Sequence, residues 1–179
     1  GLVNTEMMYT NMMEKFKWGG MENPEIYMDE NNQRMTMNLR NNFARLADAL
    51  VEEGQKEKAI KVLDKCVEVM PQKNIPYNFF MLPCAEAYYR ADATDKADKI
   101  VNDILSNYYS DLQYFFSMKN VKGLDYEKQQ AMAVLQKIVM LTKSFKRDAL
   151  SKDAETKFNQ MNELYQSSSA SFQGMFEEQ

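Results

Sequence analysis

The chain has 179 residues, and its 45% of hydrophobic residues with only 6 Gly and 4 Pro are typical of a helix-rich globular protein rather than a disordered one. The formal net charge of −4 provides no basic surface, so nucleic acid is not an expected partner. The absence of His excludes Ser-His-Asp, Cys-His and zinc-protease centres within this chain.

Cysteine content and hydropathy narrow the class of protein further. Cys66 and Cys84 are too few for a disulfide framework and lack metal-ligand spacing, so we expect buried free thiols; a bridge is the alternative in an oxidising compartment. No apolar run approaches the roughly 18 residues of a membrane span, so we expect no membrane insertion by this chain. We also expect no metal and no cofactor.

Because the sequence begins with Gly1 rather than Met, we expect a piece excised from a longer protein.

A helix and a loop are predicted over residues 4–28. Asn4 or Thr5 can cap the helix, which should run to about Lys17. Its apolar residues recur every four positions, and they are Met8, Met12 and Phe16.

The loop over residues 18–28 contains Gly-Gly and Asn-Pro pairs, which break helical hydrogen bonding. Trp18 and Tyr27 are expected to anchor this connection to the body, because aromatic side chains bury much apolar area. A binding role for the loop is the alternative.

Residues 29–71 form the best-defined repeat. Asp29 is a plausible N-cap for a long helix that reaches Glu53, and a second helix should run from about Gln55 to Met70. The large and small residues lie where a tetratricopeptide unit needs them. They are Phe43, Leu46 and Leu50 in the first helix, and Ala59, Leu63 and Cys66 in the second.

A second repeat is predicted over residues 76–118 and a helical hairpin over residues 125–179. Pro83 lacks an N–H donor, so we expect a kink or a late helix start there. In the C-terminal hairpin, Asp125 should cap the first helix and Ser151 the second.

The three hairpins share one spacing, in which an apolar residue precedes a small one by 13 positions. The pairs are Leu46 and Ala59, Cys84 and Ala97, and Leu141 and Ala154. The intervals between units are irregular, so the third match is the weakest. The sequence therefore predicts an all-α, tetratricopeptide-like fold of about seven helices in a single domain, residues 1–179, with two clear hairpins and one degenerate hairpin.

The first helices of such repeats usually line a binding surface. The template places a mixed apolar and acidic set of residues there: Asn41, Asp48, Glu52, Phe79, Glu86, Tyr89 and Arg90. Ala44, Asp48 and Pro83 occupy positions where a clamp for carboxylate-ended tails needs basic or amide residues, so such a clamp is disfavoured.

An aromatic-rich segment offers a second candidate surface. Tyr108, Tyr109 and Tyr114 would suit a platform for a sugar or a peptide, while plain packing between repeats is the alternative. The 15 Met residues lie mostly on helix stripes, so we interpret them as core residues rather than as a plastic binding surface.

Three runs carry a resemblance to a known family. They are EKFKWGGMENPEIYMDENNQRM, LRNNFARLADALVEEGQKEKAIKVLDKCVEVMP and IPYNFFMLPCAEAYYRA. Residues 12–165 resemble the C-terminal soluble region of bacterial multi-pass membrane proteins related to protein O-mannosyltransferases. The resemblance implies a glycosyltransferase-like membrane parent of which this chain is the helical tail, on the periplasmic side. The presumed catalytic acids of that family lie in its membrane part, so no catalytic residue carries over.

The leading hypothesis is a non-catalytic protein-interaction or scaffold domain, which binds a protein, a peptide or the membrane part of its own parent. The alternative is a carbohydrate-contacting helical module of a surface glycan system. A stand-alone enzyme is not expected, because the sequence lacks a Gly-rich phosphate loop and a nucleophile motif.

Overall fold

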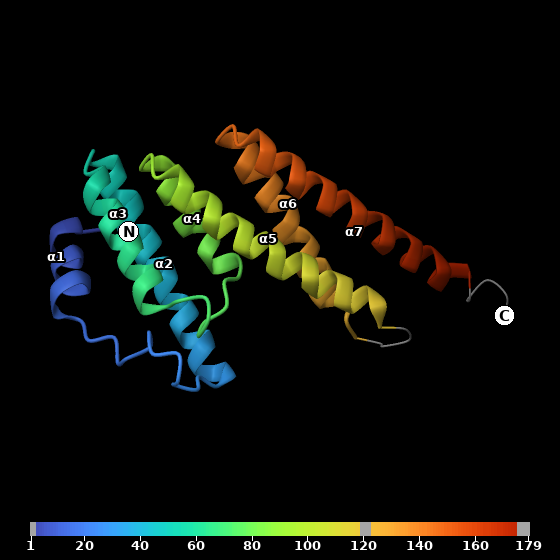
Figure 1. Cartoon of the computed structure of the whole chain (residues 1–179), viewed down its shortest axis with the longest axis horizontal. Helices are drawn as coiled ribbons and strands as arrows, with labels where there is room; N and C mark the ends of the chain where they lie inside the picture. The colour runs from blue at the N-terminus through green and yellow to red at the C-terminus, as the bar shows by residue number, and fades with distance from the viewer. Residues whose placement is uncertain (1–2, 119–122, 175–179) are drawn as a thin grey trace. The chain divides into compact units, whose positions relative to one another are not determined.

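A computed structural model describes residues 3–118 and 123–174, with side chains to residue 167. These residues are all-α and contain no strand, which confirms the predicted fold class (Figure 1). Besides seven α-helices, these residues form one π-helical turn, η1, directly after α1, and one 3-10 turn, η2, directly before α4. The elements are α1 (Thr5–Thr10), η1 (Asn11–Lys15), α2 (Glu30–Glu52), α3 (Lys56–Val69), η2 (Phe79–Met81), α4 (Leu82–Arg90), α5 (Thr94–Ser117), α6 (Asp125–Ser144) and α7 (Asp148–Gly174).

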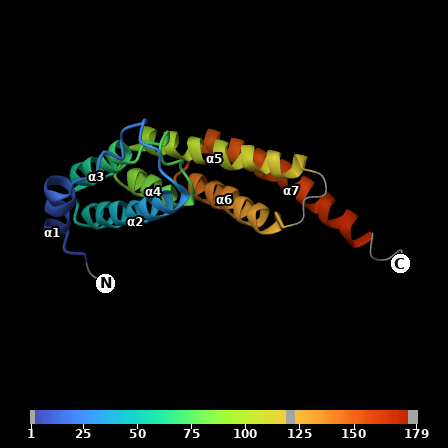
Figure 2. The ribbon, with the colours of Figure 1, turned by 90° about the horizontal axis from the view of Figure 1, so that it is seen from below.

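Two compact units divide the chain, Gly1–Val101 and Asn102–Gln179, and the boundary between them lies within α5. The sequence had predicted one domain. In the first unit, α1 lies beside α2 and α3 (Figures 1 and 2). In the second, α6 and α7 pack as the predicted antiparallel hairpin.

Side-chain caps begin the early helices where the sequence predicted them. The Asn4 side chain accepts a hydrogen bond from the Met7 backbone N–H at 2.9 Å, and Asp29 accepts one from the Asn32 N–H at 2.8 Å. The hydroxyl of Thr5 donates to Glu53 at 2.9 Å and ties α1 to the end of α2.

The loop after η1 is held by one of its two predicted anchors and by a contact that was not predicted. Trp18 does anchor it, with its ring 5.1 Å from that of Phe43, but Tyr27 is 88% exposed, so its predicted anchoring role is wrong. The Asn74 side-chain amide also donates to the carbonyl oxygens of Met21 (2.8 Å) and Asn23 (2.7 Å), which fastens the turn by its backbone.

The second repeat begins late, as Pro83 predicted. Residues 79–81 form the 3-10 turn η2, and Pro83 occupies the first turn of α4, where its missing N–H costs no helical hydrogen bond.

All three hairpins turn through the same Schellman geometry. In each, a residue with positive φ follows the first helix: Gly54 (76°), Asp92 (63°) and Lys146 (54°). The next backbone N–H bonds a carbonyl five residues earlier. These bonds join Gln55 to Leu50, Ala93 to Tyr88, and Arg147 to Thr142, at 2.8–2.9 Å. Each following helix begins two residues after the positive-φ residue.

This shared turn corrects the register of the third hairpin. Aligning Lys146 with Gly54 makes Ile138 and Ser151 the counterparts of Leu46 and Ala59, rather than Leu141 and Ala154. Ile138 and Ser151 are also 13 residues apart, and both are buried. The predicted Ser151 cap is therefore wrong, because α7 starts at Asp148 and Ser151 is already inside the helix.

The predicted cap at Asp125 is also wrong. α6 begins at Asp125 itself, and the preceding residue, Leu124, makes no side-chain cap hydrogen bond. The acidic side chain instead lies in the first helical turn, where the helix dipole favours it.

Candidate functional site

The candidate surface predicted from the repeat template is partly assembled. Asp48 and Glu52 lie one turn apart on α2, and Glu86 and Arg90 lie one turn apart on α4. Arg90 Nη1 is 2.8 Å from Asp48 Oδ1, and Arg90 Nη2 is 3.5 Å from Glu52 Oε1. We call these four residues the α2–α4 face.

Acidic charge exceeds basic charge within this face, since one guanidinium stands among three carboxylates. Burial raises the pKa of Asp48, and the nearby Glu86 and Glu52 raise it further, while Arg90 opposes the shift. The 2.8 Å ion pair alone would lower this pKa. The raised pKa of Asp48 therefore reflects its burial first, and the neighbouring carboxylates second.

Three other residues predicted for this surface lie apart from the four or beneath the surface. Tyr89 is only 5% exposed, so its predicted place on an open surface is wrong; its hydroxyl donates to Asp98 Oδ1 at 2.7 Å and joins α4 to α5. Asn41 is half-buried, two turns before Asp48. Phe79 lies in η2, 42% exposed, with its ring 4.1 Å from that of Phe80.

The predicted tyrosine platform is not uniform. Tyr109 donates to Gln160 Oε1 at 2.7 Å, and the Lys157 ammonium lies 5.7 Å from the centre of its ring, so Tyr109 is engaged with α7. Tyr108 is half-buried. Tyr114 is 62% exposed, beside Phe115 at 6.2 Å between ring centres.

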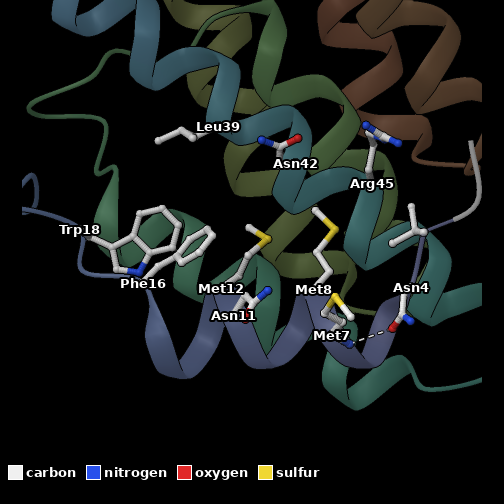
Figure 3. A pocket seen from close by; sticks show the side chains of 11 residues that line it. Asn4, Met7, Met8, Asn11, Met12, Phe16, Trp18, Leu39, Asn42 and Arg45 are labelled. Atoms are coloured by element: carbon white, nitrogen blue, oxygen red, sulfur yellow. Dashed lines mark hydrogen bonds between the residues drawn. The ribbon is translucent and has the colours of Figure 1, made fainter.

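A pocket of about 410 Å³ in the first unit was not predicted (Figure 3). It lies between α1–η1 and one side of α2, with Phe16 and Trp18 at one end and Met8 and Met12 extending from α1 and η1 toward α2. The full lining is Val3, Asn4, Met7, Met8, Asn11, Met12, Phe16, Trp18, Leu39, Asn42 and Arg45. The four-residue spacing of Met8, Met12 and Phe16 was the available signal, but it was interpreted as an ordinary core stripe.

Metal-ligand groups, thiols and a buried phenol are further side chains that could carry chemistry. Among the described residues, no group of three His, Cys, Asp or Glu residues could hold a metal ion. The two cysteines are free and buried, and burial raises the pKa of the Cys66 thiol. Burial also raises the pKa of Tyr88, whose hydroxyl donates to Asp64 at 2.8 Å.

Comparison with known proteins identified no relative of this chain. No family model matches the chain, and no match was found among curated proteins or solved structures. Within residues 3–118 and 123–174, no helix has an apolar stretch long enough to cross a membrane.

Proposed function

We propose that this chain is a non-catalytic interaction domain that binds a basic peptide segment of a partner protein at the α2–α4 face. The observation that carries the proposal is the placement of three carboxylates around Arg90 on two adjacent first helices. Such helices commonly present the binding surface of helical repeat proteins. Because complementary charge steers association, the excess of carboxylates favours a Lys- or Arg-bearing segment.

A peptide titration tests this proposal. A twelve-residue peptide with alternating Lys and Ala is titrated into ¹⁵N-labelled protein at low salt, with a Glu/Ala peptide of equal length as the control ligand. We expect the Lys peptide to shift amide resonances of α2 and α4, and we expect added salt to weaken the effect. The double variant Asp48→Asn, Glu52→Gln should bind several-fold more weakly.

The matched control is Glu57→Gln, an exposed carboxylate of α3 outside this face. Equal binding by the double variant and by wild type would overturn the proposal. So would equal binding of the acidic and basic peptides.

We further propose that the partner is a glycosyltransferase-like membrane protein, on the periplasmic side, to which this chain is attached. Support comes from the resemblance of residues 12–165 to the C-terminal region of proteins related to protein O-mannosyltransferases. The complete reading frame tests this directly, since it should encode a bundle of apolar segments before residue 1. Deleting the domain from that parent should change transferase activity, acceptor choice or protein level, and no change in all three would count against the idea.

A carbohydrate-binding role is the second candidate, and the exposure of Tyr114 favours it. Exposed aromatic rings can stack on apolar sugar faces. Calorimetric titration with oligosaccharides should then show binding that Tyr114→Ala removes. Tyr126→Ala serves as the matched control, because Tyr126 is similarly exposed (67%) but lies on α6.

A further inference from the structure

The pocket between α1–η1 and α2 gathers exposed apolar side chains around a buried floor. Met7 is 63% exposed and Phe16 is 54% exposed, while Met12 beneath them is only 4% exposed. Large apolar side chains left in water around a concavity mark sites that a ligand covers. The volume of about 410 Å³ is in the range of small-molecule sites.

The walls suit a flexible, unbranched ligand. Three of the lining side chains are methionines, which are themselves unbranched and adapt to different shapes. Leu39 on α2 and Trp18 at one end complete the apolar surface (Figure 3). The floor is built by a π-helical turn, in which the Phe16 N–H bonds the Asn11 carbonyl at 2.9 Å. Such turns are rare in proteins, and those that occur often lie at functional sites.

One cationic group lies on the rim. Arg45 is exposed, and none of the described residues places a carboxylate within ion-pair distance of it. This sets it apart from Arg90, which pairs with Asp48, and from Arg34, which pairs with Glu30. The Asn11 and Asn42 side chains on the same rim also make no hydrogen bond to a described residue. The rim therefore offers one positive charge and amide donors beside an apolar interior.

We propose that this pocket binds a free straight-chain alkyl carboxylate, with the chain among Met7, Met8 and Met12 and the carboxylate at Arg45. The apolar walls remove the chain from water, and the guanidinium supplies the complementary charge. This site is distinct from the α2–α4 face, and its test does not depend on peptide binding there.

Trp18 makes the test direct, because it is the only tryptophan in the chain and it lines the pocket. Decanoate is titrated into the full chain below its micelle-forming concentration while Trp18 emission is recorded. We expect a saturable change, and binding of octanoate that is weaker by roughly tenfold, since each buried methylene contributes a factor of about three to four. Arg45→Gln should weaken decanoate binding about fivefold.

Arg34→Gln is the matched control, since it removes an exposed arginine of the same helix that does not line the pocket; its decanoate affinity should equal that of wild type. Met7→Gln tests the apolar wall at an exposed position where folding is little affected, and it should weaken decanoate binding about threefold.

Any result of three kinds would overturn the proposal. The first is no Trp18 response to decanoate. The second is decyltrimethylammonium binding as tightly as decanoate, or Arg45→Gln binding decanoate as tightly as wild type. The third is a Trp18 response to phosphatidylglycerol vesicles but not to free decanoate, which would indicate a membrane surface instead of a free carboxylate.

Discussion

Arg40 Nη2 lies 2.6 Å from the backbone carbonyl oxygen of Ile75, 35 residues further along the chain. The same guanidinium donates to the carbonyl of Pro76 at 3.0 Å and lies 5.2 Å from the centre of the Tyr77 ring. Its side chain is fully buried, and burial lowers the pKa of Arg40. A single buried cation thus fixes the linker between the first two repeats by its backbone.

Replacing Arg40 should destabilise the folded chain. Arg40→Met leaves the linker carbonyls buried without donors, so we expect the free energy of unfolding to fall by about 3 kcal/mol. Urea unfolding followed by Trp18 emission measures the loss in this unit. Arg34→Met removes an exposed ion pair with Glu30 and should change the free energy of unfolding by at most about 0.5 kcal/mol. Similar losses in the two variants would contradict the role assigned to Arg40.

The shared turns predict opposite effects of glycine at two lysines. Lys146 has φ of 54°, a conformation that costs a side-chain-bearing residue about 1 kcal/mol, so Lys146→Gly should stabilise the α6–α7 hairpin. Lys137→Gly, at an exposed position inside α6, should destabilise it by about 1 kcal/mol. Urea unfolding monitored by circular dichroism compares the stability of the two variants with that of wild type. A change of the same sign in both variants would refute the prediction.

The buried cysteines should be inert in the folded chain. Both are 1% exposed, and burial raises the pKa of the Cys66 thiol, so little thiolate is available for reaction. We expect no reaction with an aromatic disulfide reagent until urea unfolds the protein, after which both thiols should react. A mass measured without reductant should match the reduced chain. A mass lower by two hydrogens would show a Cys66–Cys84 bridge.

Asp48 should make stability depend on pH. Burial, together with Glu86 and Glu52, raises the pKa of Asp48 in the folded state. The folded state therefore holds this proton more tightly than the unfolded state, and stability declines as pH rises through the folded-state pKa. Asp48→Asn should match wild type near pH 3 and exceed it at pH 7. Glu163→Gln, at an exposed position of α7, serves as the control, and a pH-independent effect of Asp48→Asn would contradict the prediction.

The candidate site was predictable only in part. Helical spacing placed Asp48 with Glu52 and Glu86 with Arg90, because residues four apart share a helix face. It did not reveal that Tyr89 is buried, since that depends on Asp98 accepting its hydroxyl across the next turn. The pocket was missed because buried Met12 and exposed Phe16 follow the same four-residue spacing, and only the packing of the folded chain separates them.

The sequence alone determined the all-α class, the first two hairpins, a cap at Asn4 or Thr5, the Asp29 cap, and a kink or late start at Pro83. These features depend on local chemistry: which residue caps, which lacks a donor, and which positions repeat. Tertiary structure decided the burial of Arg40, the π turn after Thr10 and the register of the third hairpin. The burial of Arg40 depends on backbone groups brought together over a long separation, and the register depends on a turn at Lys146, a residue type with no intrinsic preference for positive φ. No residue type marks the π turn in the sequence.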